Sequence, residues 1–375
     1  MDEQDRLILW LHYGTELNYK LFEKIREEYF YLEEALEDVQ KGNFARFPEK
    51  MKEHVKSRLI EASKPGFMDR YCGWMDKKGV GILTSDAYNY PSLLKQIPDP
   101  PPVLFYRGQW EGDPQLPVAL VGTRRCTEYG KEAARKFGKE LAGAGATVVT
   151  GMATGIDGYG ALGALECREA EFPVIGVLGC GIDVVYPKGN EKLYEAVAAR
   201  GCLMTEFLPK TPPLGRNFPI RNRIISGLSQ GTIVVEAGEK SGASITAGLA
   251  LEQGREVFAL PGRISDPMSA GTNRMIRRGE ARLITSVQEV LEEFGMDYGG
   301  EEVPVVNFKD LAPLEKQIYR LLSEGEKNED ELMEELDCPV GELISTLTAM
   351  TFSGIMKQLP GGVYALDTMA VRVVY

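Results

Sequence analysis

Histidine is almost absent from this sequence: the chain has two, His12 and His54, both near its N-terminus. A mechanism that needs a histidine base in the central part of the chain is therefore excluded. The six cysteines are scattered and form no Cys-x-x-Cys pair. This pattern argues against a zinc site and a disulfide framework, and fits reduced thiols in a cytoplasm. We expect no metal and no cofactor.

A signal peptide and long apolar runs are missing too. The first residues, Met1 to Arg6, are acidic rather than basic and then apolar, so they do not resemble a secretion signal. No stretch approaches the ~18–20 consecutive apolar residues that span a bilayer. The sequence predicts a cytoplasmic protein that makes no use of a membrane.

The net charge of −12 is unevenly distributed along the chain. Residues 1–114 carry 16 basic and 20 acidic side chains, and residues 286–375 carry 6 and 18. The middle, residues 115–285, carries 21 and 17 and is the only net-basic part. Because phosphate affinity depends on where lysine and arginine lie, an acidic chain can still hold a basic groove.

Two segments precede the central domain. Leucine, isoleucine and tyrosine recur at helical spacing between Leu17 and Leu32, and we expect residues 1–64 to form a helical domain that ends at Lys64-Pro-Gly66. A proline-dense stretch, Ile97 to Val103, lies further on. It cannot form a regular helix and is predicted to be an extended connector within the next domain, residues 65–295.

Short, wholly apolar runs alternate with helical patterns from Val118 onward. Such alternation indicates an α/β fold with a parallel sheet buried on both faces, here an extended Rossmann-like core. The expected strands are 118–121, 147–150, 173–178, 232–235 and 256–260, and two of the expected helices are 129–144 and 244–253. Ligands bind at the carboxyl ends of such strands, which in this chain are followed by glycine-rich turns.

The C-terminal part predicts a winged helix. Residues 296–310 have the composition of a linker, and three amphipathic helices are expected near 313–323, 328–336 and 340–352. Two β-like segments, 355–359 and 363–366, follow around a Pro-Gly-Gly turn. Three helices and then a hairpin are the order of a winged-helix domain, which we place at 311–370.

Two glycine-rich turns of the core are candidate anion sites. After the first strand, Gly122 allows close backbone approach, Thr123 offers a hydroxyl and Arg124 can clamp a phosphate; a plain tight turn with exposed arginines would have the same sequence. After the second strand, Gly151 and Gly155 frame a turn suited to an anion at a helix N-terminus. Asp157, two residues on, more simply caps that helix.

The strongest candidate site is the segment from Asn217 to Ser229. It combines cations, amides and an aromatic ring around a proline break: Asn217, Phe218, Arg221, Asn222 and Arg223. Phosphate clamps beside a stacking ring are what single-stranded nucleic acid needs, although Phe218 could instead belong to the core. Ser241 and Gly242 form a further turn, where Glu239 stands in place of the glycine that a Walker loop needs before its lysine.

No Gly-x-Ser-x-Gly elbow and no metal-ligand cluster appears in the core. Anion cradles with arginines, but with no nucleophile and base, favour binding over catalysis. We therefore expect this protein not to be an enzyme.

Taken together, these motifs resemble those of the DNA-processing protein A family (DprA, also called Smf). The family's motifs recur in order over about 210 residues, as Val118–Arg124, Thr150–Asp157, Val177–Asp183 with Tyr186-Pro187, Asn217–Ser229, Ser241–Ala247 and Ala250–Gly262. The proline-rich stretch from Tyr90-Pro91 to Arg107-Gly108 matches as well.

The resemblance implies a homodimer that binds single-stranded DNA and loads the recombinase RecA onto it, as in natural transformation (competence) and DNA recombination, with possible contact to single-strand-binding protein. It also implies that residues 1–64 are similar to a helix-hairpin-helix or SAM-like domain. This segment is degenerate, because Leu11 to Glu16 lacks the usual Gly-x-Gly hairpin, so we expect no DNA binding there.

Three features depart from the family pattern. Thr154 stands where members commonly carry lysine or arginine, and Ala161 where they often have histidine; the first removes one expected phosphate contact. Residues 311–367 hold 4 basic and 11 acidic side chains, and the expected recognition helix, Val340–Thr351, has no cation. A helix without cations is poorly suited to DNA, so we expect the C-terminal domain to contact protein or to regulate the core.

The main alternative function is a nucleotide-processing enzyme of the phosphoribohydrolase type, which has a similar Rossmann-like core. Those enzymes carry Pro-Gly-Gly-x-Gly-Thr followed by glutamate, whereas this chain has Glu236 to Gly242, Glu-Ala-Gly-Glu-Lys-Ser-Gly, at the comparable strand end. A weaker alternative makes the acidic C-terminal domain the effector and the core its platform.

Overall fold

The computed structural model of the 375-residue chain describes residues 2–296, 305–367 and 371–374. The chain divides into two compact units, Met1–Asp297 and Tyr298–Tyr375, which are described separately below. Among the described residues, no helix combines the length and the apolar character needed to cross a membrane.

The first unit begins with the predicted helices, α1 (Glu3–Thr15), α2 (Tyr19–Glu28), α3 (Leu32–Gln40) and α4 (Glu53–Ala62). Side chains start the first two: Asp2 accepts the N–H of Asp5, and Asn18 accepts that of Leu21. A fifth helix, α5 (Phe67–Lys77), follows Gly66. The φ of Gly66 is 72°, a left-handed value that glycine adopts without strain. Helix α5 was not predicted, because Pro65 and Gly66 indicated only a domain boundary.

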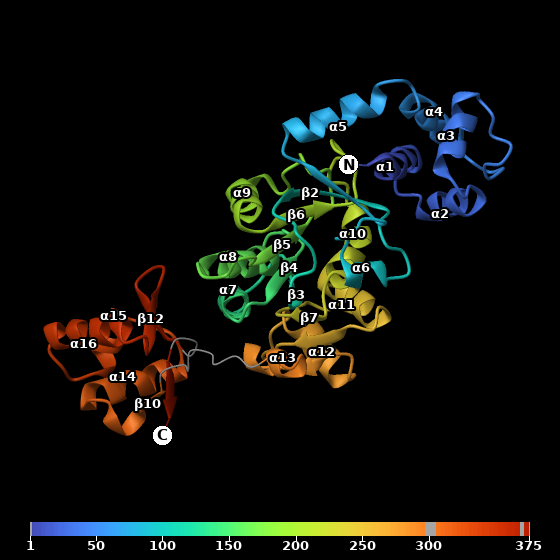
Figure 1. Ribbon diagram of the computed structural model, residues 1–375. Helices are drawn as coiled ribbons and strands as arrows, with labels where there is room; N and C mark the ends of the chain where they lie inside the picture. The colour runs from blue at the N-terminus through green and yellow to red at the C-terminus, as the bar shows by residue number, and fades with distance from the viewer. Residues whose placement is uncertain (1, 297–304, 368–370, 375) are drawn as a thin grey trace. The chain divides into compact units, whose positions relative to one another are not determined.

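A nine-stranded sheet, in the order β1-β2-β6-β5-β4-β3-β7-β8-β9, forms the centre of this unit (Figure 1). The strands are β1 (Gly81–Thr84), β2 (Val103–Gly108), β3 (Pro117–Val121), β4 (Thr147–Thr150), β5 (Val174–Val177), β6 (Cys202–Thr205), β7 (Gly231–Val234), β8 (Glu256–Ala259) and β9 (Arg282–Leu283). All neighbours from β6 through β5, β4, β3, β7 and β8 to β9 pair in parallel. Strand β2 pairs antiparallel with both β1 and β6, so it alone runs against the direction of the other strands. The five predicted strands are all present, which confirms the α/β class.

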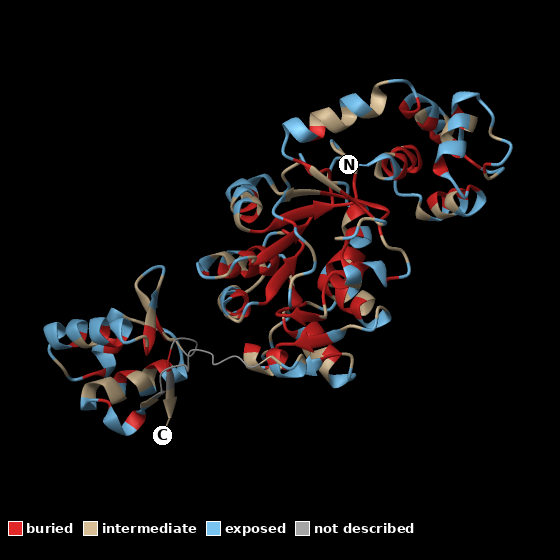
Figure 2. Cartoon of the chain, viewed as in Figure 1, coloured by how far each residue is buried: buried red, intermediate tan, exposed pale blue. Residues whose placement is uncertain are grey.

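Helices cover both faces of the sheet. Helices α7 (Glu128–Gly143), α8 (Ile156–Glu166) and α9 (Glu191–Arg200) lie on one face, and α6 (Ser92–Lys95), α10 (Asn217–Gly227) and α11 (Gly242–Glu252) lie on the other (Figure 1). The strands between them are almost wholly buried (Figure 2), as their continuous apolar sequences require. Helices α12 (Ala270–Arg277) and α13 (Val287–Glu293) complete the unit.

The sheet changes direction at β3. From β3 the chain proceeds to β4, β5 and β6 on one side, and β7, β8 and β9 lie on the other. The carboxyl ends of β3 and β7 are therefore a topological switch point, where open α/β sheets leave a crevice for ligands.

The second unit has the predicted order of three helices and a hairpin. Helices α14 (Pro313–Glu324), α15 (Glu329–Glu335) and α16 (Val340–Phe352) precede β12 (Met356–Leu359) and β13 (Val363–Leu366), and β11 (Lys327–Asn328) joins the hairpin. The predicted linker was too long at its C-terminal end. Val305–Asn307 forms β10, which pairs with β14 (Arg372–Val374), and Phe308 is buried in the core of this unit. Residues 297–304 of that linker lie outside the described residues.

Candidate functional site

An open cavity of about 720 Å³ lies at the switch point. Its walls come from the loop after β3, the turn before α8, the first turns of α10 and the loop that leads from β7 into α11. Four segments that are far apart in the sequence thus meet at one edge of the sheet. Three of them are the glycine-rich turns that the sequence analysis selected.

The loop after β3 is held in place so that its arginines face outward. A Cβ atom on Gly122 would lie 2.5 Å from Cγ1 of Ile156 and 2.9 Å from the Glu236 carbonyl oxygen, so only glycine fits. Thr123 donates its N–H to that same carbonyl at 2.8 Å, and its hydroxyl accepts the N–H of Arg125 at 3.2 Å. The two arginines that follow, Arg124 and Arg125, are exposed in the cavity wall.

The turn after β4 also depends on close backbone approach. Gly155 has a φ of 81°, and a Cβ there would lie 2.4 Å from the carbonyl oxygen of Thr123. This contact joins the second glycine-rich turn to the first. Neither Gly151 nor Gly155 lines the cavity; they let the surrounding chain come together behind it.

Asp157 does not act as the N-cap of α8, since Gly155 holds that position. Its carboxylate accepts the N–H of Gly151 at 3.1 Å and faces the buried guanidinium of Arg221. Burial raises the pKa of Asp157, and Arg221 together with backbone N–H groups works in the opposite direction. The two charges compensate each other in the floor of the cavity.

Hydrogen bonds hold the guanidinium group of Arg221 in the floor of the cavity. Its Nη1 donates to the carbonyl oxygens of Gly151, at 2.7 Å, and of Val177. Burial lowers its pKa, and the carboxylate of Asp157 opposes that effect. The side chain lines the cavity but is only 3% exposed, so it presents positive charge without projecting into solvent.

An aromatic ring stands between the cations. Phe218 is half-buried near the start of α10, and its ring lies 5.2 Å from the guanidinium carbon of Arg124 and 5.9 Å from that of Arg221. Tyr186 lies on another side, with ring centroids 5.3 Å apart and an angle of 34° between the planes. The cavity therefore offers two aromatic rings beside two guanidinium groups, an arrangement that suits a base next to its phosphates.

The predicted proline break does not occur. Pro219 is the third residue of α10, in the first turn, where a backbone N–H has no partner within the helix. The helix therefore continues from Asn217 to Gly227. Its 3.6-residue period determines which side chains of the motif face the cavity. Phe218, Arg221 and Asn222 line the cavity, whereas Asn217 and Arg223 are buried and do not.

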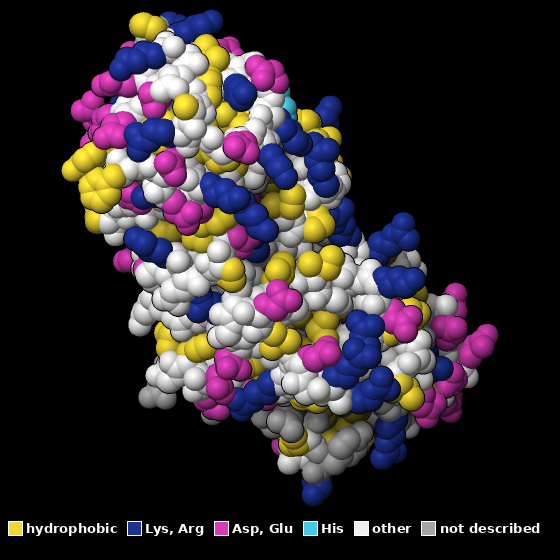
Figure 3. All heavy atoms as spheres, turned by 90° about the vertical axis from the view of Figure 1, so that its right-hand side faces the viewer, with side chains coloured by type: hydrophobic (Ala, Val, Ile, Leu, Met, Phe, Trp, Pro, Cys, Tyr) yellow, Lys and Arg dark blue, Asp and Glu magenta, His cyan; other side chains and the backbone are white. Residues whose placement is uncertain are grey.

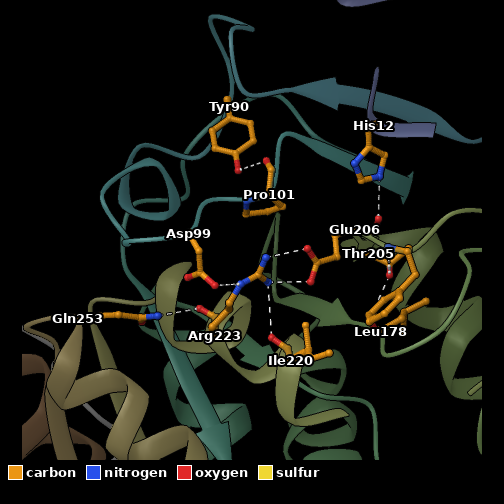
Figure 4. Close-up of polar contacts among 11 residues, drawn as sticks. His12, Tyr90, Asp99, Pro101, Leu178, Thr205, Glu206, Ile220, Arg223 and Gln253 are labelled. Carbon is orange, nitrogen blue, oxygen red and sulfur yellow. Dashed lines mark hydrogen bonds and ion pairs between the residues drawn. The ribbon is translucent and has the colours of Figure 1, made fainter. Parts of the chain in front are cut away.

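Arg223 is engaged elsewhere (Figure 4). Its guanidinium forms two 2.7 Å hydrogen bonds to the carboxylate of Glu206, and its Nε donates to Asp99 at 2.8 Å. Its donors are thus used by carboxylates of the protein. The geometry gives Arg223 the role of fastening α10 to the end of β6 and to the proline-rich stretch, and Asn217 donates to the Pro212 carbonyl oxygen at 3.2 Å.

The turn before α11 closes the site. Ser241 is the N-cap of α11 and accepts the N–H of Ala243 at 3.3 Å, while Gly242 is exposed with open space where a Cβ would be. Helix N-termini attract anions, and Lys240 adds an exposed positive charge to the same wall.

Eight of the twelve predicted site residues line the cavity: Gly122, Thr123, Arg124, Phe218, Arg221, Asn222, Ser241 and Gly242. The sequence analysis did not select Arg125, Tyr186 or Lys240. Tyr186 lies inside a family motif, Arg125 directly follows the motif Val118–Arg124, and Lys240 directly precedes the motif Ser241–Ala247, so the motifs and their neighbours were the available signal. Thr154 is exposed but does not line the cavity.

Charge near the site is local rather than spread over a surface. In Figure 3, lysine and arginine side chains are interspersed with aspartate and glutamate over the visible face. The exposed cations of the cavity are Arg124, Arg125 and Lys240, against the exposed carboxylate of Glu239. Among the described residues, no group of three or more His, Cys, Asp or Glu side chains is placed to hold a metal.

Comparison with known proteins identifies the family. The model of the DNA recombination-mediator protein A family matches residues 81–295, which include every segment of the cavity. The chain belongs to this family. This assignment confirms the resemblance that the ordered motifs indicated.

Individual proteins of the family are similar to this chain in sequence. The chain is 36% identical over 297 residues to Protein Smf of Escherichia coli (strain K12), covering 77% of this chain and 78% of the relative. It is 41% identical over 218 residues to the DNA processing protein DprA of Bacillus subtilis (strain 168), covering 58% and 72%.

Solved structures of the family share the fold. The X-ray structure of DprA from Streptococcus pneumoniae matches with a TM-score of 0.64 and 30% identity, over 80% of this chain and 100% of that chain. DNA processing protein A from Helicobacter pylori, described for its single-stranded DNA binding mode, matches with a TM-score of 0.51 and 31% identity, over 58% and 97%.

Proposed function

We propose that this protein binds single-stranded DNA in the cavity at the switch point. The observation that carries the proposal is the half-buried ring of Phe218 with guanidinium groups 5.2 Å and 5.9 Å away. Bases stack on such a ring whatever their identity, and the cations meet the phosphates between them. The family relationship and the single-stranded DNA binding mode described for the Helicobacter pylori relative support it.

Each part of the cavity has a separate task in this proposal. Arg124, Arg125 and Lys240 contact phosphates, Phe218 and Tyr186 stack on bases, and the N-terminus of α11 at Ser241 and Gly242 receives a further phosphate. Thr123 and Asn222 offer polar contacts beside them, and Arg221 supplies fixed positive charge. Gly151, Gly155, Asn217 and Arg223 act indirectly, because they shape and fasten the walls.

The wider role that we propose is that of a non-catalytic recombination mediator in the cytoplasm. The chain would deliver single-stranded DNA to the recombinase RecA, act as a homodimer and displace or contact single-strand-binding protein. The acidic winged-helix-like unit would contact protein rather than DNA. A filament-formation assay with the cognate RecA, on DNA covered by single-strand-binding protein, tests this role.

Fluorescence anisotropy with an unstructured oligonucleotide tests the site. We expect Phe218→Ala to weaken binding by about 1–3 kcal/mol, the contribution of one stacked base. Arg124→Ala removes a phosphate contact and should make the dependence of log affinity on log salt shallower by about 0.7. Binding that both variants leave unchanged would refute the site, and release of a base from nucleoside monophosphates would favour the enzyme alternative instead.

A further inference from the structure

A second cavity, of about 610 Å³, lies where the N-terminal helices meet the sheet domain. It is lined by α1, α4 and α5 on one side and by the loop Leu208–Thr211 on the other. Figure 1 shows α5 linking the first four helices to the sheet. This cavity takes no part in the site described above.

Aromatic side chains make up half of the lining residues on the helical side of this cavity, and charged side chains make up the other half. The ring of Tyr13 packs edge-on against that of Phe67, with centroids 5.2 Å apart, and against that of Tyr71 at 5.4 Å. These three rings are therefore in contact with one another and less available to a ligand. Trp74, one turn further along α5 than Tyr71, is half-buried, and its ring contacts the ammonium group of Lys210, 5.7 Å from the ring centroid. Trp74 is therefore the ring that is placed to meet a ligand.

Two cations in this cavity are available. Arg58 donates to the Tyr13 carbonyl oxygen and to Glu16 and is thus part of the wall. Arg70 and Lys210, by contrast, are exposed and have no ion pair among the residues that the structure describes. Glu61 adds one exposed carboxylate to the lining, as Glu239 does in the first cavity. A stacking ring beside two cations that have no ion pair is similar to the chemistry of the first cavity.

The backbone holds Lys210 in an unusual conformation. Its φ is 67°, a left-handed value that residues other than glycine seldom adopt, and its N–H donates to the carboxylate of Asp183 at 2.7 Å. Strained residues of this kind persist where the surrounding structure imposes them, often at binding sites. Here the conformation presents the lysine over Trp74.

A single loop separates the two cavities. Thr211 lines the second cavity, and Pro213, two residues later, lines the first. Two residues of chain span at most about 7 Å, so the rims of the cavities are adjacent.

We propose that the second cavity is a further subsite for the same strand of single-stranded DNA. A strand that leaves the first cavity crosses the loop at 211–213, places a base on Trp74 and sets its phosphate between Lys210 and Arg70. This inference rests on the proposed function and adds the N-terminal helices to the DNA-binding surface, through stacking and not through a hairpin motif.

Oligonucleotide length separates the two cavities experimentally. Anisotropy is measured with oligothymidylates of about 6 and about 20 nucleotides, one near the lower end of the range of about 4–16 nucleotides for single-strand sites and one longer than that range. The longer strand should bind more tightly, and Trp74→Ala should remove about 5-fold to 100-fold of affinity from the longer strand alone. Lys210→Asn, a residue that tolerates the left-handed backbone, should also weaken only the longer strand.

Tryptophan fluorescence supplies a second readout. The chain has three tryptophans, of which Trp10 and Trp110 are buried, so quenching by a stacked base reports on Trp74. We expect the longer strand to quench the signal, the shorter strand to leave it unchanged, and Trp74→Phe to abolish the quenching while binding persists. Lys139→Ala, an exposed lysine of α7 outside both cavities, is the charge-matched control for Lys210.

The outcomes are distinct. An equal gain with length in the wild type, Trp74→Ala and Lys210→Asn would overturn the inference and leave the proposed function standing. Quenching by thymidine monophosphate without any gain for the longer strand would assign the cavity to a free nucleotide and overturn it as well. If the wild type binds neither strand, both the proposed function and the inference fail, whereas loss of both strands in Arg124→Ala supports the first cavity independently.

Discussion

Arg223 offers the sharpest test of the structure, because its sequence motif predicts a DNA contact and the structure gives it another task. Its guanidinium and the carboxylate of Glu206 are 9% and 4% exposed, respectively, and share two 2.7 Å hydrogen bonds (Figure 4). The substitution to consider is Arg223→Met, which keeps much of the volume and removes the charge.

The expected loss of stability follows from burial. Removing one partner of a buried pair leaves an uncompensated charge and costs about 3–5 kcal/mol. The bond from Arg223 to Asp99 adds little, because the Asp99 side chain is 48% exposed and pairs of that kind contribute about 0–1 kcal/mol. Arg223→Met/Glu206→Gln should recover most of the loss, since no buried charge remains.

The pH dependence has a definite sign. Burial already raises the pKa of Glu206, and Arg223 opposes the rise, so removing the arginine raises that pKa further. A carboxyl whose pKa is higher in the folded state destabilises the fold as pH rises through that value. The deficit of Arg223→Met relative to the wild type should therefore be larger at pH 8 than at pH 5.

Urea unfolding followed by tryptophan fluorescence measures these effects. All three tryptophans lie in the first unit, so the signal reports on that unit alone. Arg135→Met is the matched control, because its ion pair with Glu166 has side chains that are 60% and 37% exposed and should cost less than about 1 kcal/mol. If Arg223→Met left the unfolding midpoint unchanged and made the salt dependence of DNA binding shallower, Arg223 would be a phosphate contact and this reasoning would be wrong.

Three further predictions concern the glycine turns, a buried histidine and the C-terminal unit. Gly155→Ala should destabilise the first unit by about 1–3 kcal/mol and weaken DNA binding, because Gly155 has a φ of 81° and a Cβ would lie 2.4 Å from the Thr123 carbonyl oxygen; the urea midpoint and anisotropy measure both, and an unaffected variant would contradict the close approach. His12 donates its Nε2–H to the Glu206 carbonyl oxygen at 3.1 Å, and burial lowers the pKa of His12 to about 4; the wild type should therefore lose on the order of 3 kcal/mol of stability as pH falls from above 6.5 through that value, and His12→Gln should lose less over the same titration. Deleting residues 298–375 should leave the unfolding of the first unit and its affinity for oligothymidylate within about 2-fold of the full chain, since that unit is compact by itself; a large loss of affinity would place part of the site in the acidic unit.

The sequence predicted much of the fold because its signals are local. Apolar runs identified the buried parallel strands, and helical periodicity identified the N-terminal helices. Strands β1, β2, β6 and β9 of the sheet were not predicted, nor was helix α5. Strand β2 pairs antiparallel with β1 and with β6, and its Phe105 lies opposite Thr205, far along the chain. A local sequence period contains no information on such a distant partner.

The sequence by itself determined the family, the position of the candidate site in the only net-basic segment, and the residue types that line its cavity. It could not decide which side of α10 each residue of the Asn217–Ser229 motif would face. Only the helix and its neighbours did that: one turn directs Phe218 and Arg221 toward the cavity, and two residues later Arg223 points to Glu206. The physical reason is that the buried carboxylate of Glu206, just after β6, pairs with Arg223, because either charge would be unfavourable if buried alone.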